Sequence, residues 1–148
     1  MVMQYFGHPF SSYTWKAEIA LIEKEVDYDF RSVDPEYPDN GAELAKHSPT
    51  GKFPLLLDGK QAIFESSIII EHLQRHHAST GQVLIPMHPD AALRVRLWDR
   101  LFDQYVMTPM QALTADLLRP EGDRDVLGAD QARANLASAY AWINRHLE

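Results

Sequence analysis

Apolar and polar positions alternate in short blocks along the first half of the chain, and each block predicts one element of secondary structure. Residues 2–6 form a brief apolar run typical of a strand, residues 13–25 carry apolar side chains at helical spacing, and residues 26–31 again favour a strand. A strand, helix and strand in this order need a right-handed crossover, so the two strands are expected to be parallel. The inner face of the helix is expected to hold Ala17, Ala20 and Leu21, with Trp15 as a further candidate.

A pair of strands led by a proline comes later, and a helix follows it. Pro54 heads the apolar run 55–57, which suits a residue that cannot donate to a sheet ladder. Asp58 and Gly59 predict a tight turn into a second strand over residues 61–64. Residues 66–77 then predict a helix, so the expected order of elements over residues 1–77 is β-α-β-α-β-β-α.

Polar segments rich in proline and glycine interrupt this pattern twice. In the first, residues 34–41, no regular structure is expected, and only a short helix over residues 42–46 precedes the strand pair. The second, residues 78–90, is broken by Gly81, Pro86 and Pro89 and is the predicted linker between domains. The chain is therefore expected to divide into a mixed domain over residues 1–77 and a helical domain over residues 91–148.

Beyond the linker the pattern is entirely helical. Apolar side chains recur every four residues and predict a broad buried stripe, and Pro109 should interrupt that helix before a segment over residues 111–118. A second helix is expected over about residues 130–146. The two stripes consist of Leu93, Leu97, Leu101 and Tyr105 in the first helix, and of Leu136, Tyr140, Ile143 and Leu147 in the second.

Composition limits the classes of function. The 148 residues are 45% hydrophobic, enough to bury a core, and carry a formal charge of −7 with a pI near 5.4. That charge argues against binding to nucleic acid or to an anionic membrane, and no apolar run approaches the length of a membrane span. We therefore expect a soluble cytoplasmic protein. The chain has no cysteine, so any thiol chemistry must use a thiol supplied by a cosubstrate.

Two motifs in order carry a resemblance to a known family. A Gly-x-Pro loop (Gly7 and Pro9) stands before a serine pair, and Lys52-Phe53-Pro54 precedes the strand pair that ends in Glu65-Ser66. Together they resemble the soluble glutathione transferases, over the whole chain. The resemblance implies a thioredoxin-like α/β first domain, an all-α second domain, glutathione as a cosubstrate and a homodimer.

The resemblance also implies a role for each residue of a glutathione site. Ser66 and the free amides of its helix would take the γ-glutamyl carboxylate, and Glu65 would meet the ammonium group. A cis Phe53–Pro54 bond would aim the Phe53 backbone at the extended peptide, and Lys52 would lie near the glycyl end. Judged by residue type alone, Pro54 could simply start a strand, Glu65 and Ser66 could be a solvated acid and a helix cap, and Lys52 could be a solvated cation.

Ser11 is the candidate catalytic residue. A hydroxyl that donates a hydrogen bond to sulfur, beside a helix N-terminus, favours the thiolate over the thiol. By residue type alone a serine before a helix is more often an N-cap, and the resemblance assigns the thiol to Ser11 and leaves Ser12 as the better cap. Tyr13 is the alternative donor, although its place inside the helix favours packing.

The second substrate would be a small, apolar electrophile. Its pocket is expected to involve Phe10 and, from the helical domain, Trp98, Phe102 and Tyr105, although their helical spacing is also typical of core packing. Residues 11–15 resemble in addition the maleylacetoacetate isomerase branch, from which Tyr13 and residues 16–18 depart. A glutathione-dependent isomerase and a non-catalytic module for binding or dimerisation are therefore the alternative functions.

Two further expectations concern the chain end and a histidine cluster. Proteins resembling this one carry more helices after the second stripe, so we expect a C-terminally truncated, incomplete helical domain. His72 and His76 are four residues apart on one predicted helix, a spacing that can hold a metal ion. With His77 adjacent and no third ligand at a matching position, the sequence favours a cluster at the helix end and no metal site.

Overall fold

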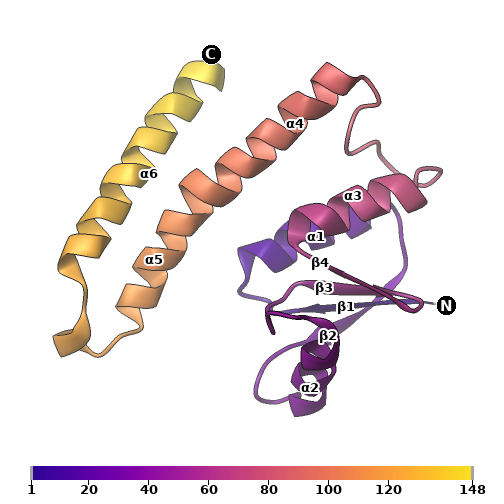
Figure 1. Ribbon diagram of the computed structural model, residues 1–148, viewed down its shortest axis with the longest axis horizontal. Coiled ribbons are helices and arrows are strands. Elements are labelled where there is room, and N and C mark those ends of the chain that lie inside the picture. Colours follow the sequence, from indigo (N-terminus) through magenta and orange to yellow (C-terminus); the bar gives the residue numbers. More distant parts are fainter. Residues whose placement is uncertain (1, 148) are drawn as a thin grey trace. The chain divides into compact units, whose positions relative to one another are not determined.

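A computed structural model describes residues 2–147, which form two compact units that divide after Met87 (Figure 1). The first unit has the predicted order β-α-β-α-β-β-α and is a thioredoxin-like fold, as expected. Its elements are β1 (Met3–Gly7), α1 (Ser12–Glu23), β2 (Tyr28–Ser32), α2 (Pro38–His47), β3 (Leu55–Asp58), β4 (Gln61–Phe64) and α3 (Ser66–His76).

The four strands form one mixed sheet in the order β2-β1-β3-β4. β1 and β2 are parallel, as the crossover predicts, whereas β3 runs antiparallel to both β1 and β4. In the register of the sheet Phe6 pairs with Leu55, and Leu55 pairs with Phe64. The end of β1, the start of β3 and the end of β4 therefore lie at the same edge.

Both faces of the sheet are covered, because successive side chains of a strand point to opposite sides. α1 and α3 lie on one face and α2 lies on the other (Figure 1). Leu56 belongs to the core beneath α1 and α3, whereas its neighbours Leu55 and Leu57 pack with Leu44 of α2. This explains why β3 is a continuous apolar run: it is a central strand that is buried on both faces.

Three local expectations for the first unit were wrong. α2 starts at Pro38 rather than at residue 42, because proline is favourable in the first turn of a helix, where its missing N–H costs nothing. β2 starts at Tyr28 rather than at residue 26, after a turn in which Glu25 has a φ of 52°. Trp15 is 59% exposed, because its indole Nε1 donates to the carbonyl of Pro9 (2.6 Å) outside the core.

The second unit consists of helices only. The chain does not break at Pro109, because α4, η1 and α5 follow one another without a gap and the proline lies in the first turn of α5, preceded by a π-helical segment. No helix within residues 2–147 is long and apolar enough to cross a membrane. The elements are α4 (Pro89–Leu101), η1 (Phe102–Met107), α5 (Thr108–Leu117), the short 3₁₀ helix η2 (Glu121–Asp123) and α6 (Val126–Leu147).

The predicted burial of the first apolar stripe is wrong for most of its members. Leu93 is 66% exposed, Leu97 is 57% exposed and Tyr105 is also exposed. The buried positions are instead smaller ones, such as Ala92 and Val106. Within this unit α6 packs along α5 and η1.

Candidate functional site

The register of the sheet gathers the two sequence motifs at one edge. The loop after β1 follows Gly7, the loop before β3 ends at Pro54, and the turn after β4 contains Glu65. Adjacent strands are about 5 Å apart, so these three segments are neighbours although they are far apart in sequence. Backbone groups and side chains from all three can therefore contact a single extended ligand.

Gly7 allows α1 to start close to β1. A Cβ atom at this position would lie 2.3 Å from the methyl carbon of Thr14, a distance that atoms do not tolerate. Thr14 is fully buried, and its hydroxyl accepts a hydrogen bond from the backbone N–H of His8 (3.2 Å). The phenol of Tyr5 donates to the Thr14 carbonyl (2.5 Å). These contacts fix the loop that carries Ser11.

Ser11 is the N-cap of α1, and Ser12 is the first helical residue, so the expectation that Ser12 is the better cap was wrong. The Ser11 hydroxyl oxygen accepts from the Thr14 N–H (3.2 Å), and the Ser11 N–H donates to the His8 carbonyl (2.9 Å). The two serines are equivalent as cap residues, and the turn from His8 decides between them. Within residues 2–147 no acceptor takes the Ser11 hydroxyl proton, so it is available to a ligand. Tyr13, the alternative donor, is half-buried in the first turn of the helix.

The loop before β3 contacts the loop after β1. The Phe53–Pro54 peptide bond is cis, and the Phe53 ring stacks on the His8 ring with centroids 6.0 Å apart. Pro54 is buried, Phe53 is half-buried and Lys52 is exposed, with its carbonyl accepting from the Ser48 hydroxyl (3.2 Å). The backbone of Phe53 is thus held beside the segment that presents Ser11.

The turn into α3 has an unusual backbone. Glu65 has a φ of 68°, a region that a glutamate rarely adopts and that is often found at functional sites. Its side chain is exposed and forms no cap bond to α3, and its carbonyl accepts the first helical bond from Ile69 (2.9 Å). Ser66 is buried at the first position of α3. A serine hydroxyl together with the amides of a helix N-terminus is suited to binding a carboxylate.

The structure adds Lys16 to this end of α3. Its ammonium Nζ lies 3.0 Å from the hydroxyl oxygen of Ser67, so α1 and α3 are joined next to Ser66. The lysine brings a positive charge to a helix N-terminus that already favours anions. Sequence reasoning missed this contact, because the two residues are 51 positions apart and no local pattern connects them.

The residues expected to hold the second substrate lie in both units. Phe10 is 94% exposed in the loop before α1. In the second unit Trp98 contacts Phe102 (5.9 Å between ring centroids) and Trp142 of α6 (5.6 Å), and Phe102 is 44% exposed. Tyr105 lines a cavity of about 300 Å³ that also involves Leu101, Ser138, Ala139 and Trp142. Trp142 had not been singled out from the sequence.

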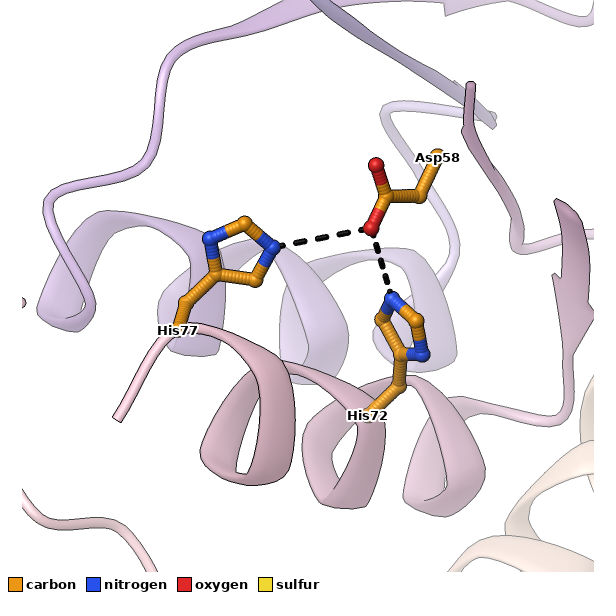
Figure 2. Close-up of side chains that lie close together, drawn as sticks. All are labelled: Asp58, His72 and His77. Carbon is orange, nitrogen blue, oxygen red and sulfur yellow. Dashed lines mark hydrogen bonds and ion pairs between the residues drawn. The ribbon is translucent and has the colours of Figure 1, made fainter. Parts of the chain in front are cut away.

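A second polar cluster lies at the other end of β3. The carboxylate of Asp58 accepts a hydrogen bond from the His72 Nε2 (2.9 Å), and His77 approaches the same oxygen at 3.5 Å (Figure 2). The expectation that the histidines have no third ligand group at a matching position was therefore wrong. The hydrogen bond with His72, and then that with His77, holds the pKa of Asp58 below its ordinary value. His76, the other member of the pair noted in the sequence, is exposed and its ring is tilted against that of His72 (4.5 Å between centroids).

Comparison with known proteins assigns the family. Residues 1–75 of the 148 match the family described as "Glutathione S-transferase, N-terminal domain". The chain belongs to the glutathione S-transferase family. Two curated glutathione S-transferases that it resembles are PARB of Nicotiana tabacum, 28% identical over 100% of this chain, and F6 of Arabidopsis thaliana, 30% identical over 75% of it. The chain spans 68% of the length of PARB and 59% of that of F6.

A solved member of the glutathione S-transferase family has nearly the same fold. The enzyme from Methylobacillus flagellatus KT, solved with GSH bound, superposes with a TM-score of 0.84 and is 28% identical. The superposition covers 97% of this chain and 69% of the other. The similarity includes both units, and the motifs at the sheet edge belong to the part that matches the family.

Proposed function

We propose that this protein transfers glutathione to small, apolar electrophiles, with glutathione held at the sheet edge of the first unit. The observation that carries the proposal is the buried Ser66 at the N-terminus of α3, next to the exposed Glu65, whose side chain makes no cap bond to that helix. The similarity to a relative solved with GSH bound supports the same ligand. Glutathione has a free carboxylate beside an ammonium group, which matches Ser66 and the exposed carboxylate of Glu65.

Each part of the tripeptide then has a partner. The γ-glutamyl carboxylate binds Ser66 and the amides of α3, while Glu65 pairs with the ammonium group. The Phe53 backbone bonds to the cysteinyl residue in the manner of an added strand, and Lys52 lies near the glycyl carboxylate. This arrangement directs the thiol toward the loop that holds Ser11.

Ser11 can serve two purposes with one hydroxyl. Its oxygen accepts from the Thr14 N–H, which leaves its proton free to be donated to the glutathione sulfur. A donor to sulfur stabilises the thiolate, whose unperturbed pKa is about 8.5. The thiolate forms a bond to the electrophilic carbon, the leaving group departs with its electron pair, and the thiol proton passes to solvent. Tyr13 is the alternative donor.

Calorimetry with glutathione tests the binding site. Ser66→Ala and Glu65→Gln should each weaken binding by ~1–3 kcal/mol, the range for a lost hydrogen bond to a charged group. Ser79→Ala is the matched control, since it removes an exposed hydroxyl of the same unit that lies after the end of α3. Unchanged affinity in both site variants would remove this site from consideration. Absence of any glutathione binding by the unaltered protein would instead favour the non-catalytic module.

Turnover of an activated aryl halide tests the role of Ser11. Ser11→Ala removes both the cap and the donor, whereas Ser11→Asp keeps an acceptor for the Thr14 N–H but has no hydroxyl to donate. Both should lower turnover and raise the apparent thiol pKa of bound glutathione, and only Ser11→Ala should destabilise α1. Full activity in both variants, with Tyr13→Phe inactive, would assign the chemistry to Tyr13. An isomerase would be recognised by a product that retains no glutathione.

A further inference from the structure

The side chains of Asp58, His72 and His77 converge on a small volume in the first unit (Figure 2). Asp58 ends β3, His72 lies on α3, and His77 directly follows that helix. One ligand atom from each lies within 4.8 Å of the other two. The cluster is largely shielded, because the His72 side chain is only 7% exposed and the other two are about 30% exposed or less.

This cluster is separate from the proposed glutathione site. Pro54 precedes β3 at one edge of the sheet, whereas Asp58 ends the same strand at the opposite edge. A strand rises about 3.3 Å per residue, so roughly 10 Å of β3 lies between the two regions. A ligand can therefore occupy either region without displacing the other.

We propose that Asp58, His72 and His77 bind one divalent transition metal ion, with Zn²⁺ as the representative. In tetrahedral sites Zn²⁺ holds nitrogen and oxygen ligands at about 2.1 Å, which places neighbouring ligand atoms about 3.4 Å apart. The Asp58 carboxylate oxygen is 2.9 Å from the His72 Nε2 and 3.5 Å from the His77 Nε2. Small side-chain movements, the largest between the two imidazoles, bring all three atoms to a single ion, and solvent can fill the fourth position.

The surrounding charges favour a cation at this place. The pKa of Asp58 is below its ordinary value because His72 bonds to it, so the carboxylate is ionised near neutral pH. His77 caps the C-terminus of α3, where the helix dipole contributes negative potential. Two imidazole donors and one carboxylate suit Zn²⁺, Ni²⁺ or Cu²⁺, whereas Mg²⁺ and Ca²⁺ prefer sites made of oxygen alone.

A bound ion would connect the β3–β4 turn to the end of α3. Without metal, the same three groups already form hydrogen bonds that join these elements. The ion replaces those contacts with coordinate bonds, and each imidazole nitrogen that binds the ion carries no proton. Because the folded state alone presents the three ligands together, metal binding must stabilise the first unit against unfolding.

Titration of the metal-free, untagged protein with Zn²⁺ at neutral pH, followed by calorimetry, tests the proposal. One site should saturate, and the thermal midpoint should rise with Zn²⁺ but not with Mg²⁺. His77→Ala and the nearly isosteric Asp58→Asn should each weaken the affinity for Zn²⁺ by about tenfold or more. Loss of a residue that only hydrogen-bonds to a metal ligand already costs about tenfold, so loss of a ligand should cost at least as much. His76→Ala and His47→Ala are matched controls and should retain the site.

The two control histidines, His76 and His47, belong to two other pairs of side chains that could hold the ion. His76 would pair with His72 at the spacing noted in the sequence, and His47 forms an exposed pair with Glu43 (3.1 Å). Loss of binding in either control with retention in His77→Ala would overturn the assignment, as would undiminished binding in Asp58→Asn. Imidazole nitrogen spectra of the unaltered protein give a readout that needs no variant. The Nε2 signals of His72 and His77 should shift together on addition of Zn²⁺, and a shift confined to other histidines would contradict the proposal.

Discussion

The two units of the chain bury different kinds of side chain. The first buries large residues on both faces of a sheet, among them Tyr5, Leu56 and Ile69, each with no exposed surface. The second buries mainly small residues, such as Ala92, Ala129 and Ala132, while several of its leucines are exposed. A sheet with helices on both sides encloses its apolar side chains, whereas helices packed along one side do not.

This difference implies an uneven distribution of stability. Burial contributes in proportion to the apolar area removed from water, so most of the folding free energy should reside in the first unit. The residues of the proposed glutathione and metal sites lie in that unit. Local opening is expected first in the second unit, where fewer apolar side chains are enclosed.

The largest expected effect separates the two units directly. Leu56→Ala removes a fully buried side chain from the core beneath α1 and α3 and should destabilise the first unit by about 2–5 kcal/mol. Leu97→Ala, at an exposed position of α4, should change stability by no more than about 0.5 kcal/mol. Denaturant unfolding combined with hydrogen exchange measures the free energy of unfolding of each unit. Equal costs for the two substitutions would show that Leu97 is enclosed in solution.

A smaller effect tests the close approach of α1 to β1. Gly7→Ala places a Cβ atom 2.3 Å from the Thr14 methyl carbon, and overpacking of this kind should cost ~1–3 kcal/mol. The shift of α1 should also displace Ser11 and weaken glutathione binding. Gly41→Ala is the control, because no atom lies within 4 Å of its added Cβ and alanine is the better helix former in α2. It should stabilise the protein by about 0.5–1 kcal/mol, and a loss in both variants would contradict this account.

The order of elements in the first unit could be predicted because short local signals define it. Pro54 marks the start of one strand, and Asp58 with Gly59 marks the turn to the next. The choice between Ser11 and Ser12 as the cap could not be predicted, since both are good cap residues. It depends on the hydrogen bond from Ser11 to His8, which forms only when the loop after β1 has its final shape.

Contacts between distant segments were also beyond prediction. Lys16 meets Ser67 only because α1 and α3 pack on the same face, and Asp58 meets His72 only because the β3–β4 turn lies against α3. In the second unit the periodicity identified the apolar side of α4, but a period does not say what covers that side. Leu93 and Leu97 lie on that side and are exposed, so the prediction of a buried stripe failed for them.

The smallest expected effect concerns alkaline pH and again belongs to the first unit. The Tyr28 phenol donates to the Glu18 carboxylate (2.9 Å), and burial followed by this bond raises the pKa of Tyr28 to about 12. Burial, followed by the charge of Glu18, also raises the pKa of Tyr5, whose ring meets that of Tyr28 edge-on. A raised pKa in the folded state means that the stabilisation is complete below the unfolded value of about 10 and is lost as pH rises through the folded value.

Glu18→Gln should therefore lower the pKa of Tyr28 and make the loss of stability above pH ~10 less steep, because fewer protons then distinguish the folded from the unfolded state. Tyrosinate absorbance follows the pKa, and denaturant unfolding at several alkaline pH values follows the stability. Burial is the first cause of the shift and persists in the variant, so the pKa should fall only part of the way toward its ordinary value. Glu23→Gln, on the same helix but exposed, should leave both curves unchanged. If stability falls as steeply above pH ~10 in Glu18→Gln as in the unaltered protein, burial alone protects the two phenols. The polar contact between α1 and β2 would then add nothing to the stability of the first unit.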